Sequence, residues 1–430
     1  MDYLQLTFHP AGLYQLAAFP WAFLYGYLSS FGHLPIIPRF IYLLFGGIVL
    51  SCVSMGPYSV IIFIPVLASI VLFHIISWQS IHWWALALQM AWQTACHLWL
   101  LYKEYYLQEE ITLRLFVMIS ALMLLTQKIT TLAMDIDERK VKIIPVDGGM
   151  KNWFFSGSAQ QILMFLSYLL FFPALLGGPL CSFVEFHNQV SESHRRNYPC
   201  FKQVTKGCLF ALILQTLRIL VSINISSQMS LLSCRHLNCV YTMWTTALLF
   251  KLSYYSHWLL DESLFRAAGF LKENQVDGFQ ATFYDADIWT LETTHKISVF
   301  TRTWNKSTAN WLRRLIFEKC KVGSLLITFA FSAWWHGLYP GHVFGFLCWA
   351  LLVKADYRIH KYFNPCQQSW CRRLLYRIFT WLQTQLIVAF LIMAIEMRGF
   401  KMIWLLCSSY NCFFPILYCL SLISFIKRKT

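Results

Sequence analysis

The charged residues of this chain are clustered, and long stretches between the clusters contain none. After Arg39, the next Asp, Glu, Lys or Arg is Lys103. A helix needs about 20 apolar residues to cross a bilayer, so this gap has room for two or three crossings. Soluble domains are about 25% charged, whereas 13% of this chain is charged and 57% is apolar. We therefore predict a protein that crosses the membrane many times.

Similar apolar runs recur to the end of the chain. They predict an all-α polytopic fold with about 11 transmembrane helices and additional interfacial or re-entrant helices. No repeat or linker interrupts the pattern, so residues 1–430 are predicted to form one domain. The runs lie near residues 10–30, 40–55, 58–76, 83–102, 113–133, 160–180, 207–226, 238–260, 322–353, 374–396 and 402–425.

The net charge of +15 lies mainly in short segments between apolar runs. This distribution is typical of cytosolic loops rather than of a nucleic-acid-binding surface. The polar stretches 185–206 and 354–373 are therefore expected to face the cytosol. The chain ends in Lys-Arg-Lys-Thr, which predicts a cytosolic C-terminus, whereas no basic residue precedes Arg39, which predicts a luminal N-terminus. Termini on opposite sides imply an odd number of crossings, which favours 11.

The 14 cysteines are scattered and show no spacing typical of a zinc site, so we predict no metal and no cofactor. Cys234 and Cys239 lie in one polar loop and would be able to pair if that loop is luminal. The sequence leaves this pairing open.

The run 322–353 has an unusual length. Its 32 uncharged residues would form a helix of about 48 Å, which is too long for one straight span and too short for two. Gly337, Pro340 and Gly341 lie in its middle, so the helix is predicted to break there. Irregular backbone at membrane depth is tolerated only where protein buries it or where it lines a cavity.

His336 directly precedes this break and is the strongest candidate for a catalytic residue. A neutral imidazole can take a proton from a hydroxyl group as a general base. The alternative is a hydrogen-bonded histidine with a structural role. A second polar group, Gln89, Gln93 and His97, recurs at every fourth residue and so shares one helix face. These residues either line a polar tunnel or join neighbouring helices by hydrogen bonds.

The segment 298–317 precedes the histidine and is rich in basic residues. It is predicted to form a basic amphipathic helix at the membrane interface, with Trp304, Trp311, Leu312 and Leu315 on one face. Its basic residues attract anionic lipid headgroups or form a rim for the phosphates of a nucleotide such as coenzyme A. Asn305 would cap the helix. The candidate donor-binding residues are Arg302, Trp304, Lys306, Arg313 and Arg314.

The pair Trp304-Asn305 and the later Trp335-His336-Gly337 resemble the signature of the membrane-bound O-acyltransferase superfamily. The likeness extends over nearly the whole chain, with further matching segments at 92–94, 104–107, 170–177, 254–258, 285–292, 294–300, 304–309, 311–314 and 329–337. It implies the superfamily fold with a central tunnel, and it implies that His336 is catalytic with Asn305 as its partner.

The further segments resemble the ghrelin-acylating members of this superfamily, and that closer resemblance implies transfer of an octanoyl group from acyl-CoA to a serine near the N-terminus of the ghrelin precursor, in the endoplasmic reticulum membrane. Phe329 and Ser332 lie on the helix face of His336, and Trp349 would fold back to close an acyl pocket. Two alternatives remain at this point, which are a lysophospholipid acyltransferase of the same superfamily and a membrane transporter.

Overall fold

The computed structural model describes residues 12–144, 157–191, 201–226, 237–270, 287–363 and 370–426. Within these ranges the ordered backbone is helical and contains no strand, as predicted. The chain divides into two compact units. The N-terminal unit contains residues 8–212 and 256–284, and the C-terminal unit contains residues 213–255 and 285–430. The prediction of a single domain stays a prediction.

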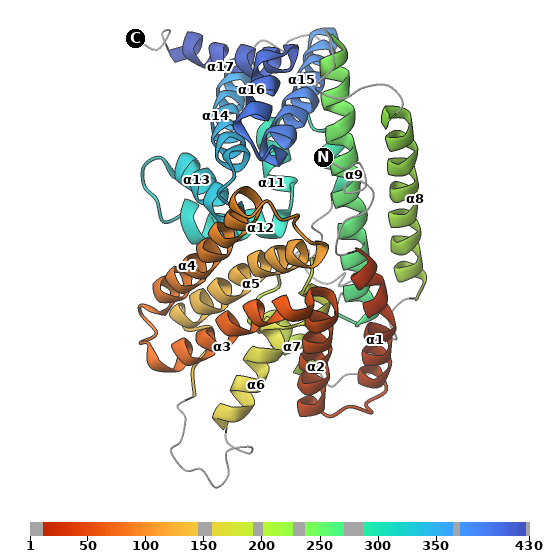
Figure 1. Ribbon diagram of the computed structural model, residues 1–430, viewed down its shortest axis with the longest axis vertical. Coiled ribbons are helices and arrows are strands. Elements are labelled where there is room, and N and C mark those ends of the chain that lie inside the picture. Colours follow the sequence, from red (N-terminus) through yellow and green to blue (C-terminus); the bar gives the residue numbers. More distant parts are fainter. Residues whose placement is uncertain are drawn as a thin grey trace. The chain divides into compact units, whose positions relative to one another are not determined.

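The N-terminal unit is built mainly from the first seven helices, among which α3, α4 and α5 pack side by side (Figure 1). Aromatic side chains fill part of its core, where the ring of Phe171 lies 4.6 Å from Phe270 and 5.5 Å from Phe265. The helices are α1 (Gly12–Ser30), α2 (Ile36–Met55), α3 (Ser59–Ile75), α4 (Ile81–Leu101), α5 (Leu113–Asp137), α6 (Gly157–Leu169) and α7 (Phe183–Ser191).

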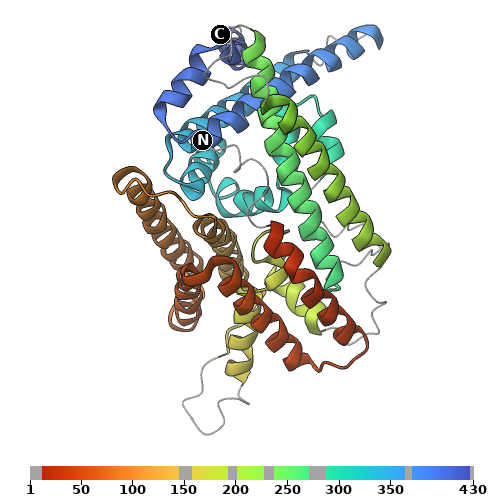
Figure 2. The same cartoon turned by 45° about the vertical axis from the view of Figure 1, so that its right-hand side comes forward.

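Two long helices, α8 (Phe201–Ser226) and α9 (Leu237–Ala267), contribute residues to both units. In the C-terminal unit, α14 packs against α11, α13, α15 and α17 (Figure 2). Its elements are α10 (Ile288–Thr293), α11 (Ile297–Thr303), α12 (Lys306–Leu312), the π-helical turn η6 (Arg313–Phe317), α13 (Ser324–His336), α14 (Pro340–Phe363), α15 (Trp370–Glu396), α16 (Phe400–Ser408) and α17 (Phe413–Ile426).

Five helical stretches among the described residues are long and apolar enough to cross a membrane. They are Ile36–Ile75, Leu113–Asp137, Gly157–Ala174, Phe201–Ile223 and Trp370–Glu396. A sixth is possible if Phe400–Ser408 and Tyr410–Leu420, which are bent by 73°, form one broken span. A multi-pass membrane protein is thus supported, while the predicted number of about 11 spans stays a prediction.

The predicted break in the run 322–353 is confirmed. Helix α13 ends at His336, and α14 begins at Pro340. Gly337, between the two helices, has a backbone φ angle of 145°, which residues with a Cβ atom rarely adopt. Pro340 opens the next helix, where its missing N–H leaves no helical hydrogen bond unmade.

Two sequence predictions about helix boundaries are wrong. The segment 298–317 is not one continuous helix, because Asn305 has a left-handed φ angle of 48° that separates α11 from α12. The polar stretch 354–373 is not wholly a loop, because α14 continues to Phe363. This extension carries the buried Asp356, whose carboxylate accepts hydrogen bonds from the backbone at the start of α11.

Candidate functional site

Asn305 sits at the N-terminus of α12 and caps it, as its position in the sequence suggested. Its side-chain Oδ1 accepts a hydrogen bond of 3.3 Å from the backbone N–H of Thr308. This bond fixes the orientation of the amide, because only the oxygen can accept. Within the described part of the chain, the Nδ2 group of Asn305 makes no hydrogen bond. It is therefore available as a donor to another molecule.

His336 is half-buried and forms the last residue of α13. The helix that Asn305 caps packs against α13 through tryptophan, since the rings of Trp311 and Trp335 lie 5.0 Å apart. Trp335 in turn lies 4.8 Å from the imidazole of His336. These ring contacts, one tilted and one edge-to-face, join the elements that carry the two residues of the predicted catalytic pair.

An aromatic ring from α14 also lies close to His336. The ring of Phe346, on α14, lies 4.8 Å from His336 and stacks on Trp349 at 6.2 Å. Trp349 lies 5.9 Å from Phe329, so the chain does fold back across the break to bring these two residues together. Ser332 is buried on the same helix as Phe329. The three predicted pocket residues thus lie in the same unit as His336, on the two helices that flank the break.

A hydrogen bond ties this aromatic group to the helix that precedes Asn305. The indole Nε1 of Trp349 donates to the hydroxyl of Thr301 on α11 at 2.8 Å. Phe300, also on α11, stacks on Trp304 at 5.5 Å. Trp304 further contacts the rings of Tyr254 and Tyr255 on α9, at 5.6 and 6.1 Å. The residue before Asn305 is therefore held by aromatic contacts from two helices.

The predicted donor-binding residues differ in exposure. Arg302 and Arg313 are exposed, whereas Trp304, Lys306 and Arg314 are half-buried. Arg313 donates to Glu318 at 2.9 Å. The polar stripe of α4 lies in the N-terminal unit and is buried.

Hydrogen bonds join that stripe to neighbouring helices. Gln89 donates to Ser69 on α3 at 3.0 Å, and Gln93 accepts from Thr126 on α5 at 2.9 Å. Gln93 also lies 3.4 Å from the imidazole of His97. These bonds agree with a role in joining helices, and the lining of a tunnel by Gln89, Gln93 and His97 stays a prediction.

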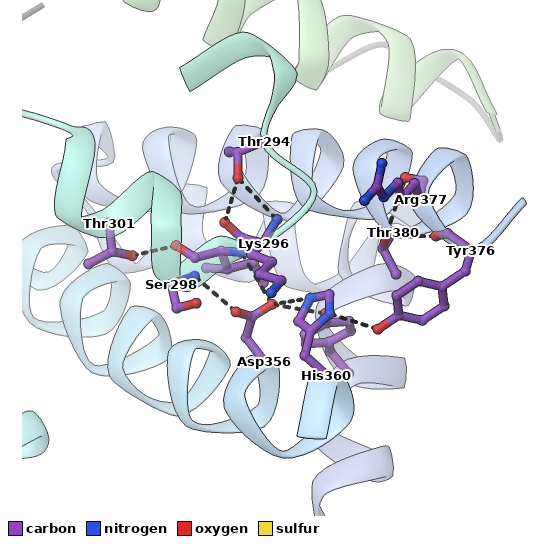
Figure 3. A network of polar contacts seen from close by, with 11 residues as sticks. Thr294, Lys296, Ser298, Thr301, Asp356, His360, Tyr376, Arg377 and Thr380 are labelled. Carbon is purple, nitrogen blue, oxygen red and sulfur yellow. Dashed lines mark hydrogen bonds and ion pairs between the residues drawn. The ribbon is translucent and has the colours of Figure 1, made fainter. Parts of the chain in front are cut away.

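Sequence reasoning missed Asp356, whose carboxylate organises the segment before Asn305 (Figure 3). This fully buried side chain accepts from the backbone N–H groups of Ile297 and Ser298 at 3.2 and 3.0 Å. It also lies 3.2 Å from His360 Nε2 and accepts from the hydroxyl of Tyr418 at 3.2 Å. The carboxylate thus caps α11 from α14. Backbone N–H groups carry no sequence signal, and the spacing of Asp356 and His360, four residues apart, is the one feature that could have indicated a pair.

Asp356→Ala is expected to destabilise the protein by about 3 kcal/mol, because it leaves two buried N–H groups and the hydroxyl of Tyr418 without their acceptor. Thermal unfolding of the purified protein in detergent measures this loss. Tyr418→Phe is the matched control, since it removes one hydroxyl contact and keeps the capping carboxylate. Equal unfolding midpoints for Asp356→Ala and the unmodified protein would contradict this role.

An ion pair between the buried Lys251 and the half-buried Glu292 holds α10. Lys251 on α9 donates to both carboxylate oxygens of Glu292 at 2.8 and 2.9 Å. The hydroxyl of Tyr255 donates to the same carboxylate at 2.7 Å, and Gln385 on α15 accepts from Lys251 at 3.2 Å. The two short helices before Asn305 are therefore anchored by α9, α14 and α15.

The structure tests the predicted pairing of Cys234 with Cys239 only in part. Cys239 is disulfide-bonded, and Cys234 lies outside the described residues. No cluster of three or more metal-binding side chains occurs in the described ranges. The predicted absence of a metal and of a cofactor stays a prediction.

Comparison with known proteins gives the same family as the sequence motifs at Asn305 and His336. The profile of the membrane-bound O-acyltransferase family matches residues 155–395, which include both Asn305 and His336. Membrane-bound ghrelin O-acyltransferase MBOAT4 of Mus musculus is 50% identical to this chain, and that of Rattus norvegicus is 49% identical. Each alignment covers 100% of this chain and 99% of the relative.

More distant similarity extends to lipid-modifying enzymes. Membrane-bound glycerophospholipid O-acyltransferase 1 of Mus musculus is 25% identical over 89% of this chain and 82% of its own length. The difference in identity favours the peptide-acylating relatives over the lipid-acylating ones.

Proposed function

Because this chain belongs to the membrane-bound O-acyltransferase family, we propose that it transfers an octanoyl group from acyl-CoA to a serine near the N-terminus of the ghrelin precursor. Full-length similarity to ghrelin O-acyltransferases supports this choice of acceptor. Membership in an acyltransferase family also argues against the transporter alternative. The observation that carries the chemistry is the packing of the Asn305-capped helix on the helix that ends at His336.

His336 acts as the general base in this proposal. Its imidazole takes the proton from the serine hydroxyl as the serine oxygen attacks the carbonyl carbon of the thioester. The carbon–sulfur bond then breaks, and the imidazolium returns the proton to the leaving thiolate. The acyl group passes directly to serine, so no covalent enzyme intermediate is required.

Asn305 stabilises the negative charge that develops on the thioester oxygen. A pre-oriented donor at that oxygen is among the strongest means of lowering the barrier to acyl transfer. The hydrogen bond from Thr308 supports this role, because it directs the Nδ2 group of Asn305 away from its own helix. A donor held in this way needs no reorganisation during the reaction.

The aromatic group formed by Phe329, Phe346 and Trp349 binds the acyl chain beside His336. These rings are buried and offer an apolar surface that suits a hydrocarbon chain. Ser332 completes this pocket, and the bulk of the rings restricts the length of the chain. Arg302, Trp304, Lys306, Arg313 and Arg314 form a cytosolic rim toward the nucleotide.

The membrane position follows from the two substrates. Acyl-CoA approaches from the cytosol and the peptide from the lumen of the endoplasmic reticulum, so the reaction takes place within the membrane. The C-terminus faces the cytosol and the N-terminus the lumen, in accordance with the distribution of basic residues.

The test uses purified protein in detergent, octanoyl-CoA and a short peptide with the N-terminal sequence of the precursor. We expect mass spectrometry to find octanoate on the serine, and no product with a peptide that has alanine in its place. Lysophosphatidylcholine is offered in a parallel reaction. Transfer to this lipid but not to the peptide would overturn the proposal and favour the glycerophospholipid branch, to which the chain is 25% identical.

A further inference from the structure

Trp349 lies at the centre of the aromatic group to which we assign the acyl chain. Its ring lies 5.9 Å from Phe329 and 6.4 Å from Phe300. It stacks on Phe346 at 6.2 Å, with an angle of 13° between the ring planes. Phe346 in turn lies 4.8 Å from the imidazole of His336. Trp349 is therefore one ring further from His336 than Phe346 is, where the far end of a bound acyl chain would lie.

A hydrogen bond to Thr301 orients the indole of Trp349. In the part of the chain that the structure describes, the indole Nε1 has one hydrogen-bond partner, the hydroxyl of Thr301 on α11, at 2.8 Å. An indole N–H can only donate, and a buried donor that loses its acceptor costs free energy. Trp349 is buried, so the position of the Thr301 hydroxyl decides which way the ring faces.

The hydroxyl of Thr301 is itself fixed by the backbone of α11 (Figure 3). It donates to the carbonyl oxygen of Ile297 at 2.8 Å, which leaves its lone pairs free to accept from the indole. The backbone N–H of Ile297 donates to Asp356 on α14 at 3.2 Å. Helix α14 therefore holds α11 through Asp356, and α11 in turn holds the Trp349 ring of α14 through Thr301.

This arrangement makes Trp349 a rigid wall, unlike the phenylalanine rings around it. One methylene group in a hydrophobic pocket changes discrimination by about 10- to 200-fold, and rejection of a longer chain requires a wall that does not move aside. A phenylalanine ring has no polar atom and can turn without losing a hydrogen bond. Trp349 cannot turn without leaving the hydroxyl of Thr301.

We propose that Thr301 is a positioning residue that limits the length of the acyl chain by holding Trp349 across the end of the pocket. This inference rests on the proposed function for the identity of the ligand, a straight hydrocarbon chain carried by coenzyme A. Thr301 acts through Trp349, so its effect is on the choice between donors rather than on the chemical step at His336.

The test compares octanoyl-CoA with dodecanoyl-CoA as donors to the same peptide. Thr301→Val removes the acceptor of the indole and keeps the branched shape of the side chain. We expect the ratio of kcat/KM for octanoyl-CoA to that for dodecanoyl-CoA to fall about tenfold or more, because the indole turns away and opens the end of the pocket. Thr301→Ser keeps the hydroxyl and should restore most of the selectivity.

Thr328→Val is the matched control. The half-buried Thr328 on α13 also donates to the carbonyl oxygen four residues earlier, at 2.7 Å. Its replacement therefore makes the same chemical change without removing the partner of Trp349, and the ratio should stay that of the unmodified protein. Equal falls of kcat/KM for both donors in Thr301→Val would indicate a merely structural role and would overturn the proposal.

A second pair of variants shows whether Thr301 acts through the indole N–H. Trp349→Phe keeps an aromatic ring but has no N–H, so we expect it to lower the selectivity by itself. Thr301→Val should then have no further effect in the Trp349→Phe protein, because the interaction that it breaks is already absent. A full additional loss of selectivity in the double variant would overturn the proposal.

A binding measurement separates this inference from the proposed function. The probes are non-reactive thioether analogues of octanoyl-CoA and dodecanoyl-CoA, and their affinities are measured in detergent without an acceptor. If Thr301→Val shifts the ratio of affinities toward the longer analogue while the unmodified protein octanoylates no peptide, the proposed function fails and the role of Thr301 stands. If the peptide is octanoylated but neither the ratio of affinities nor the ratio of kcat/KM changes, the role of Thr301 is wrong and the proposed function stands.

Discussion

Replacing His336 with alanine is expected to reduce the rate of octanoyl transfer by about 10²- to 10⁴-fold, the range that a general base typically contributes. The serine hydroxyl would have no group to accept its proton as it attacks the thioester. Binding of a non-reactive thioether analogue of octanoyl-CoA should change little, since the imidazole acts on the acceptor. The measurement compares single-turnover octanoylation of the peptide with the affinity for the analogue.

His342→Ala is the matched control for this experiment. His342 lies just beyond the same break, with its ring 6.1 Å from that of His336. It has the same chemistry but belongs to the first turn of α14, and we expect its variant to retain most of the transfer rate. A His336→Ala protein that transfers octanoate at the normal rate would contradict the general-base role, and so would a larger loss in His342→Ala.

The parts of the site that sequence predicted are those with a local signal. The break after His336 follows from a run that is too long for one span and contains Gly337 and Pro340. The capping role of Asn305 follows from the residue type, although the predicted helix over 298–317 began seven residues too early. Both features depend on residues within a few positions of one another.

The parts that sequence missed depend on contacts between distant segments. Asp356 appeared to belong to a polar loop, because charges after an apolar run usually mark the end of a span. In the structure its charge is compensated by N–H groups about 60 residues earlier in the chain and by Tyr418 about 60 residues later. Similarly, the left-handed backbone at Asn305 splits a segment that has the periodicity of one helix.

Gly341 is important for packing and not as a helix breaker. The sequence predicted that it helps to end the helix, yet it lies within the first turn of α14. Its role is close packing, because a Cβ there would overlap the backbone carbonyl oxygens of Ala394, in the last turn of α15, and of Met397, which directly follows that helix. The absence of a side chain allows the two helices to approach closely just after the break.

Gly341→Ala is therefore expected to impair folding and catalysis together. The added methyl group meets backbone oxygens, which cannot move aside by changing a rotamer, so α14 must shift away from α15. Overpacking of this kind costs about 1–3 kcal/mol. Because α14 carries Phe346 and Trp349 and follows His336 directly, the shift would also displace the acyl-binding rings. We expect a lower unfolding midpoint and a transfer rate reduced by about tenfold or more, the latter corresponding to ~1.4 kcal/mol.

A graded series of glycine variants separates this steric effect from a general effect of alanine. Gly399→Ala should be nearly silent, because a Cβ there meets no atom within 4 Å. Gly345→Ala should have an intermediate effect, since its Cβ would come 2.5 Å from Cγ1 of Ile395 and 3.0 Å from the Ile395 backbone nitrogen, a less severe overlap than the one at Gly341. Unfolding midpoints and transfer rates that fall in the order Gly399→Ala, Gly345→Ala, Gly341→Ala would support close packing of α14 on α15 as the support of the site. A Gly341→Ala protein as stable and active as Gly399→Ala would show that this contact does not position His336.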